Sequence, residues 1–187
     1  MMPGGGDPTA GEEIMAATLR NALALALFGA SGLAAAGGAA GAEASGCDQF
    51  KWPIAHEQTA LAAPGAGPLS PGATLPADAG ARLKLVLLSE AKLAMPPERP
   101  PKFSPSYAGA FVLDAPAAAG VYKVTVSAGG WIDVIQEGKF LRPVNLSVAT
   151  GCANARKSVK FRFAAGPATV QLTGVGQPDI AVIVSPE

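Results

Sequence analysis

The residues best placed for chemistry lie in the segment Trp131-Ile132-Asp133-Val134-Ile135, which Glu137 follows closely. Side chains alternate between the two faces of a strand, so Trp131 and Asp133 share one face. An aspartate beside a tryptophan can hold a sugar, or act as an acid of raised pKa in a cleft. The alternative, which we favour, is that the tryptophan fills the core edge and the aspartate pairs with a lysine or arginine.

Other catalytic groups are scarce. The chain has one histidine, His56, so a metal site that needs two or three imidazoles cannot form within one chain. A Ser-His-Asp set would also require His56, and the sequence has no Gly-x-Ser-x-Gly turn. We therefore expect a partly exposed structural histidine, and we predict no catalytic set, no metal and no cofactor.

Two cysteines, Cys47 and Cys152, define the redox chemistry. In an exported chain they most simply form one disulfide. A lipid anchor on Cys47 is the alternative, because Ala44-Ser45-Gly46 resembles the small residues before a lipoprotein cysteine. Ala44 stands where leucine is usual, however, and the apolar stretch ends more than ten residues earlier. The disulfide is favoured over lipidation and over free thiols.

Residues 1–42 have the pattern of an export signal. Arg20 supplies a positive charge, Ala22–Phe28 supplies a short apolar core, and Ala40-Gly41-Ala42 supplies small residues for cleavage before Glu43. This pattern predicts a periplasmic or secreted protein.

Residues 1–14 carry three acidic residues and no basic one, so we expect translation to begin at Met15. A membrane span is the competing interpretation, but a span needs ~20 strongly apolar residues. This run is rich in alanine and is interrupted by Ser31 and several glycines, so a cleaved signal is favoured.

Cleavage before Glu43 leaves 145 of the 187 residues, a length that suits one domain. The remaining chain has 13 basic and 11 acidic residues, a net charge of +2. The densest basic segment, 156–162, alternates with apolar residues, and we interpret it as a solvated strand face. Nucleic acid is therefore not an expected partner.

Two further segments precede the strand-rich body. Cys47–Leu61 is amphipathic, with Pro53 suited to a first helical turn, so we predict a short helix there. Residues 62–80 contain four prolines and several glycines, and we predict a surface linker without ladder hydrogen bonds. The predicted division is thus 43–80 for the helix and linker and 81–187 for the β domain.

From Tyr107 onward, apolar residues recur at every second position. The pattern predicts strands at 111–114, 122–127, 159–163, 168–173 and 180–184. A proline cluster at 95–101 should form an extended crossover loop. Short strands, hairpin turns and no long helix after residue 62 predict a mainly β fold, an antiparallel jelly-roll-like sandwich preceded by a short helix.

Five segments carry a resemblance that covers nearly the whole mature chain. They are Cys47–Glu57, Met95–Arg99, Ala119–Val124, Trp131–Val134 and Arg156–Val159. Together they resemble a family of small exported proteobacterial proteins without an established function. Some members carry the name homogentisate 1,2-dioxygenase. That name implies ferrous iron held by two histidines and a glutamate, and a chain with one histidine does not match this set. In layout, residues 119–172 are also similar to galactose-binding-type jelly rolls.

These observations favour a non-catalytic binding or envelope-associated module. They leave its partner unknown, with a glycan and an envelope protein as the candidates. The oxygenase and a lipid-anchored structural protein are the alternatives. Exposed aromatic residues and neighbouring charges are common at binding surfaces. The candidate contact residues are Tyr107, Trp131, Asp133, Arg99 and Lys102.

Overall fold

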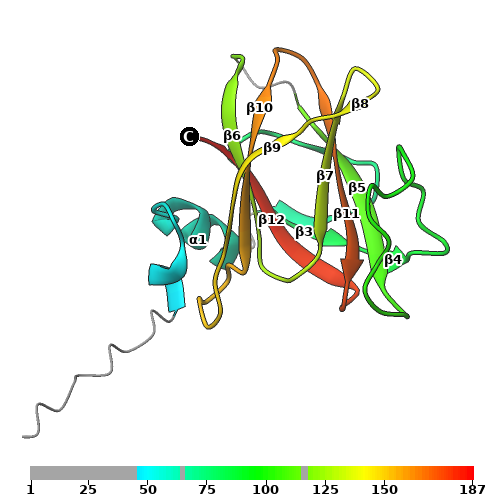
Figure 1. The fold of residues 1–187 in the computed structure, drawn as a ribbon, viewed down its shortest axis with the longest axis horizontal. Coiled ribbons are helices and arrows are strands. Elements are labelled where there is room, and N and C mark those ends of the chain that lie inside the picture. The colour runs from blue at the N-terminus through cyan, green and yellow to red at the C-terminus, as the bar shows by residue number, and fades with distance from the viewer. Residues whose placement is uncertain (1–45, 64–65, 115–117) are drawn as a thin grey trace, which may run out of the picture. The chain divides into compact units, whose positions relative to one another are not determined.

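The structure is a computed structural model that describes residues 46–63, 66–114 and 118–187. The predicted export signal lies outside these residues. The described chain forms two mostly antiparallel sheets packed face to face, with one short helix near its N-terminal end (Figure 1). This arrangement confirms the predicted antiparallel β-sandwich.

Each sheet contains six strands, which we call sheet A and sheet B. Sheet A has the order β1 (Ala66–Leu69), β3 (Gly80–Lys84), β12 (Asp179–Pro186), β6 (Gly120–Val126), β10 (Lys157–Phe163) and β9 (Pro143–Val148). Sheet B has the order β2 (Thr74–Leu75), β5 (Tyr107–Leu113), β11 (Ala168–Val175), β7 (Trp131–Gln136) and β8 (Lys139–Phe140), and β4 (Val86–Leu87) also pairs with β5.

The core lies between the sheets and follows the alternation seen in the sequence. On β10, Val159, Phe161 and Phe163 are buried in the main apolar cluster. Phe163 meets Tyr122 of β6 edge to face, with ring centroids 5.4 Å apart. Because each strand directs alternate residues into this core, the polar positions between them are left on the outer faces of the two sheets.

The segment before the strands packs on the outer face of sheet A. Its helix α1 spans Ala55–Ala62, so Pro53 lies two positions before the helix rather than in its first turn. The helix lies against β3 and β12 (Figure 1). A side chain at position 80 would collide with the carbonyl group of Ala60, so the close approach of α1 to β3 requires Gly80.

The predicted linker at 62–80 is partly wrong, because this segment contributes two short strands. β1 pairs in parallel with β3, and β2 pairs in parallel with β5. Proline cannot donate a ladder hydrogen bond, but an edge strand leaves one side unpaired and so tolerates it. Pro68 lies in β1 at the edge of sheet A, which explains how a proline-rich segment still joins the sheets.

The proline cluster behaves as predicted. Residues 88–106, which we call the proline loop, contain no helix or strand and join β4 to β5. Hydrogen bonds tie this loop to side chains of β7 and β11 in sheet B. The outer face of sheet B is therefore joined to an irregular, proline-rich segment, whereas the outer face of sheet A carries a helix.

Candidate functional site

Trp131 and Asp133 lie next to each other on β7, as the strand periodicity predicts. The indole Nε1–H of Trp131 donates a hydrogen bond to Asp133 Oδ1 at 2.6 Å. Asp133 is only 3% exposed, while Trp131 is half-buried. The other carboxylate oxygen, Oδ2, accepts longer contacts from the backbone N–H of Glu98 at 3.5 Å and from Gln171 Nε2 at 3.4 Å. Asp133 thus joins two strands of sheet B to the proline loop.

Gln171 on β11 fixes the same loop through its side-chain amide. Its Nε2 donates to the carbonyl oxygen of Met95 at 3.0 Å, and its Oε1 accepts from the Met95 N–H at 3.4 Å. Gln171 is fully buried although it lies on the outer side of the sheet. A buried amide of this kind needs hydrogen-bond partners, and the loop backbone provides them.

Two cations lie against the ring of Trp131. The guanidinium carbon of Arg99 is 4.5 Å from a ring centroid, and Lys157 Nζ is 5.1 Å away. Lys157 also donates to the carbonyl oxygen of Gly130 at 2.7 Å. Cations within about 6 Å of an indole face are attracted by the ring quadrupole. Since Arg99 belongs to the proline loop and Lys157 to β10, these two elements and β7 meet at Trp131.

Two groups near Trp131, Asp133 and Lys157, have shifted pKa values. Burial raises the pKa of Asp133, against the lowering effect of hydrogen bonds from Trp131 and Glu98. Burial lowers the pKa of Lys157; Asp133 opposes this, and the positive charges of Lys102 and Arg99 add to it. Both shifts disfavour the charged forms, because Asp133 and Lys157 are largely removed from water.

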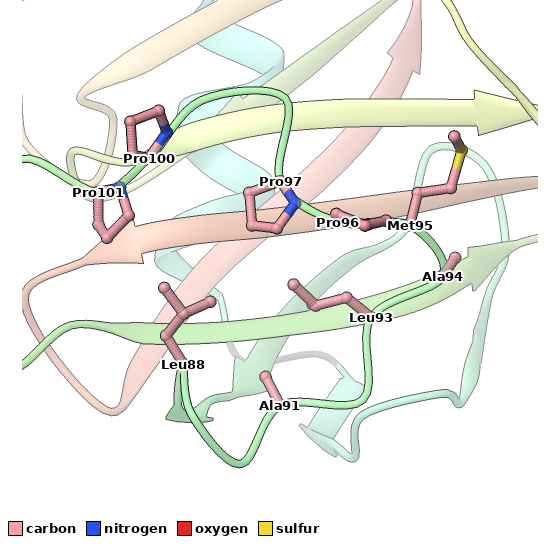
Figure 2. Close-up of a pocket in the computed structure, with 9 residues that line it drawn as sticks. All are labelled: Leu88, Ala91, Leu93, Ala94, Met95, Pro96, Pro97, Pro100 and Pro101. Atoms are coloured by element: carbon pink, nitrogen blue, oxygen red, sulfur yellow. The ribbon is translucent and has the colours of Figure 1, made fainter.

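A shallow apolar groove lies within the proline loop (Figure 2). Its volume is about 650 Å³. Nine apolar side chains line it: Leu88, Ala91, Leu93, Ala94, Met95, Pro96, Pro97, Pro100 and Pro101. Met95 both lines the groove and binds Gln171 through its backbone, and Arg99 lies between the lining residues Pro97 and Pro100 in the sequence.

Four of the five candidate contact residues are therefore associated. Arg99, Trp131 and Asp133 gather directly, and Lys102 acts electrostatically on Lys157. Tyr107 is placed elsewhere: it opens β5, pairs with Leu87 and Val175, and packs against the main core. We call Arg99, Lys102, Trp131, Asp133 and Lys157 the Trp131 cluster.

The sequence did not identify two residues that surround Trp131 and Asp133, namely Lys157 and Gln171. Lys157 belongs to the basic segment predicted to be a solvated strand face, and that interpretation is wrong for it. Lys157 is two positions from Val159 and four from Phe161, so its side chain lies on the same face of β10 as these core residues. Its amine reaches the ring of Trp131. This two-residue spacing is the sequence signal that identifies Lys157 as lying on the inner face.

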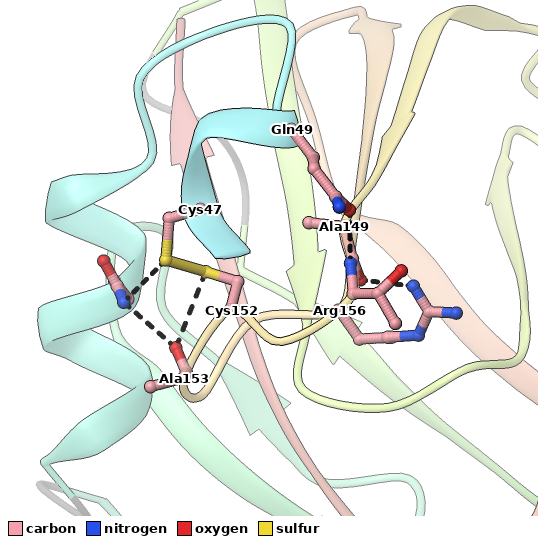
Figure 3. Close-up of a disulfide and its surroundings, with 8 residues drawn as sticks. Cys47, Gln49, Ala149, Cys152, Ala153 and Arg156 are labelled. Atoms are coloured by element: carbon pink, nitrogen blue, oxygen red, sulfur yellow. Dashed lines mark hydrogen bonds between the residues drawn. A yellow bond between two sulfur atoms is a disulfide. The ribbon is translucent and has the colours of Figure 1, made fainter. Parts of the chain in front are cut away.

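The predicted disulfide joins Cys47 to Cys152, with Cα atoms 4.5 Å apart (Figure 3). Neighbouring hydrogen bonds attach the same segment to the loop before β10. Gly46 N–H donates to the Thr150 carbonyl at 3.0 Å, and Gln49 Oε1 accepts from Thr150 N–H at 2.6 Å. The N-terminal segment is thus covalently and non-covalently fixed to sheet A.

Beneath α1 lies a second polar group, which sequence periodicity did not identify. Glu57 is 1% exposed, and its Oε1 lies 2.5 Å from Lys123 Nζ and accepts from Ser185 Oγ at 2.5 Å. Burial would raise the pKa of Glu57, but the hydrogen bonds from Lys123 and Ser185 outweigh it and hold the pKa below its usual value. His56, on the same helix, is exposed as predicted and contacts Asp78 at 2.7 Å.

Within the described ranges, no three His, Cys, Asp or Glu side chains gather closely enough to hold a metal ion. No helix in the part of the chain that the structure describes is long and apolar enough to span a membrane. None of the known protein families, curated proteins and solved structures compared with this chain matches it significantly.

Proposed function

We propose that this chain is an exported, non-catalytic binding module of the cell envelope, and that its ligand binds at the Trp131 cluster. The single observation that carries the proposal is the convergence of Arg99 and Lys157 on one half-buried tryptophan beside the apolar groove. Apolar walls with a few fixed polar groups are the usual composition of ligand sites.

The charges of the cluster favour a binding role over a structural one. The cluster contains three cations, Arg99, Lys102 and Lys157, and one carboxylate, Asp133, and Glu98 is already paired with Arg142 at 2.6 Å. Arg99 and Lys102 are exposed, so their positive charge is accessible to a ligand. An incoming anionic or polar ligand would offset that charge.

Export is supported by the signal-like pattern of residues 1–42 and by the disulfide, because disulfides persist in oxidising compartments. The disulfide also occupies the Cys47 sulfur that a lipid anchor would need. We expect mass spectrometry of the exported protein to find an N-terminal peptide beginning at Glu43 and a Cys47–Cys152 crosslinked peptide. A diacylglyceryl group on Cys47 would overturn the proposed localisation in favour of a lipoprotein.

Binding should depend on Trp131 and Arg99. We expect Trp131→Ala and Arg99→Ala each to weaken retention of an envelope glycan or protein by roughly tenfold or more, the loss typical of a central contact residue. Retention is measured by pull-down from envelope extracts, followed by titration of the purified ligand. Trp52→Ala removes the other tryptophan, which lies over the outer face of sheet A and bonds Ser158, and serves as the matched control. Equal losses in Trp131→Ala and Trp52→Ala would contradict a site at Trp131.

A further inference from the structure

The groove of the proline loop has the shape and chemistry of a site for an alkyl chain. Every residue that lines it is apolar, and five of the nine are Met95 and prolines that hold the loop extended. Its volume of about 650 Å³ falls within the range usual for small-molecule sites. Figure 2 shows Leu88, Leu93 and Pro97 directed toward the same open space.

The loop that forms the groove also carries two exposed cations, Arg99 and Lys102. Arg99 follows Pro97 by two positions, and Lys102 follows Pro101 directly. Within the described part of the chain, neither side chain forms an ion pair. Asp133 supplies one negative charge, and its carboxylate oxygens accept hydrogen bonds from Trp131, Gln171 and the Glu98 backbone rather than from either cation.

An apolar groove beside two free cations is complementary to an amphiphile with one chain and an anionic head. We propose that the groove binds the alkyl chain of a fatty acid, with its carboxylate against Arg99 and Lys102. A guanidinium can donate two parallel hydrogen bonds to a carboxylate, which favours this head group. The inference rests on the proposed function, because it names the ligand class for the same site.

Calorimetric titration of the purified protein with octanoate, decanoate and dodecanoate, each below its micelle concentration, tests the proposal. Affinity should rise with chain length, by up to about fourfold for each added methylene, the gain expected for full burial. Decanol, which has the same chain and no charge, should bind at least about tenfold more weakly than decanoate, since the charge-assisted hydrogen bonds are lost.

Variants separate the head-group site from the groove. Arg99→Gln with Lys102→Gln should remove the preference for decanoate over decanol, whereas Lys92→Gln, an exposed lysine of the same loop, should keep it. Leu93→Ser should flatten the dependence on chain length while keeping that preference. An affinity independent of chain length, or equal binding of acid and alcohol, would overturn the inference.

The fatty-acid site and the proposed function can fail separately. If no fatty acid binds but a glycan or envelope protein is retained in a Trp131-dependent way, the fatty acid is wrong and the proposed function stands. If fatty acids bind with the expected chain-length dependence and preference over the alcohol, and Arg99→Ala weakens that binding, both stand. If Trp131→Ala and Arg99→Ala change nothing with any probe, the proposed function fails as well.

Discussion

Replacing both cysteines, Cys47→Ser with Cys152→Ser, should lower the free energy of unfolding by about 3–5 kcal/mol. The disulfide closes a separation of 105 positions. In the chain-entropy model, a loop of this size restricts the unfolded chain enough to contribute up to ~4.7 kcal/mol. Urea unfolding of the oxidised protein, the reduced protein and the double variant measures the loss.

The reduced protein is the matched control, since it breaks the same bond without changing a residue. Reduced protein and double variant should unfold at similar urea concentrations, both well below the oxidised protein. Trp131 and Asp133 lie on β7 of the other sheet, so ligand affinity should remain once the variant is folded. Two titratable thiols in the native exported protein would contradict the disulfide itself.

Lys123→Met should cost about 3–5 kcal/mol at neutral pH, because it leaves Glu57 buried without its cation. Replacing both partners, Glu57→Leu with Lys123→Met, removes the buried charge and should cost much less. The exposed pair Arg82–Asp179, joined at 2.7 Å, gives the matched control. Arg82→Met should cost under about 1 kcal/mol, as exposed pairs usually do.

Lys123→Met should also reverse the sign of the contribution that Glu57 makes to the pH dependence of stability. In the native protein the pKa of Glu57 is lowered, so its stabilisation is present above the ordinary value of about 4.3 and is lost as pH falls through the folded-state pKa. Without Lys123, burial raises that pKa, so the stability contribution of Glu57 falls as pH rises above about 4.3. The difference in free energy of unfolding between the native protein and Lys123→Met should therefore grow as pH rises above about 4.3. A difference that does not change with pH would contradict the buried pair.

The sandwich could be predicted because its cause is local and repetitive. Alternation such as Val159, Phe161 and Phe163 against Lys160 and Arg162 identifies a strand and its buried face from the sequence alone. The disulfide followed from the export signal and from there being only two cysteines. These inferences needed no knowledge of which strands are neighbours.

The polar contacts could not be predicted in the same way, because they depend on the order of strands in each sheet. Lys123 and Ser185 meet Glu57 because they are paired across β6 and β12 and α1 lies against β12, although the three residues lie far apart in the chain. Gln171 reaches Met95 across 76 positions. A period-two pattern gives the face of a strand but not its partner, so buried polar residues on the outer faces looked solvated.

The linker prediction failed for a related reason. Proline density is a sound signal against central strands, and neither β1 nor β2 is central. Each adds to a sheet edge through parallel pairing with a strand that the sequence pattern does identify. Edge strands depend on their neighbour more than on their own residues, and the isolated segment therefore carried little strand signal.

The two tryptophans of the chain allow ligand binding at the Trp131 cluster to be tested within one sample. The indole Nε1–H of Trp131 donates to Asp133 in the proposed site, and that of Trp52 donates to Ser158 on the opposite sheet. Each group gives its own resonance in a ¹H–¹⁵N spectrum of the purified protein. Titration with dodecanoate, an oligogalacturonate and a neutral cello-oligosaccharide should move the Trp131 indole resonance with at least one probe and leave that of Trp52 in place. If no probe moves Trp131, or if both resonances move alike, the Trp131 cluster is not the binding site.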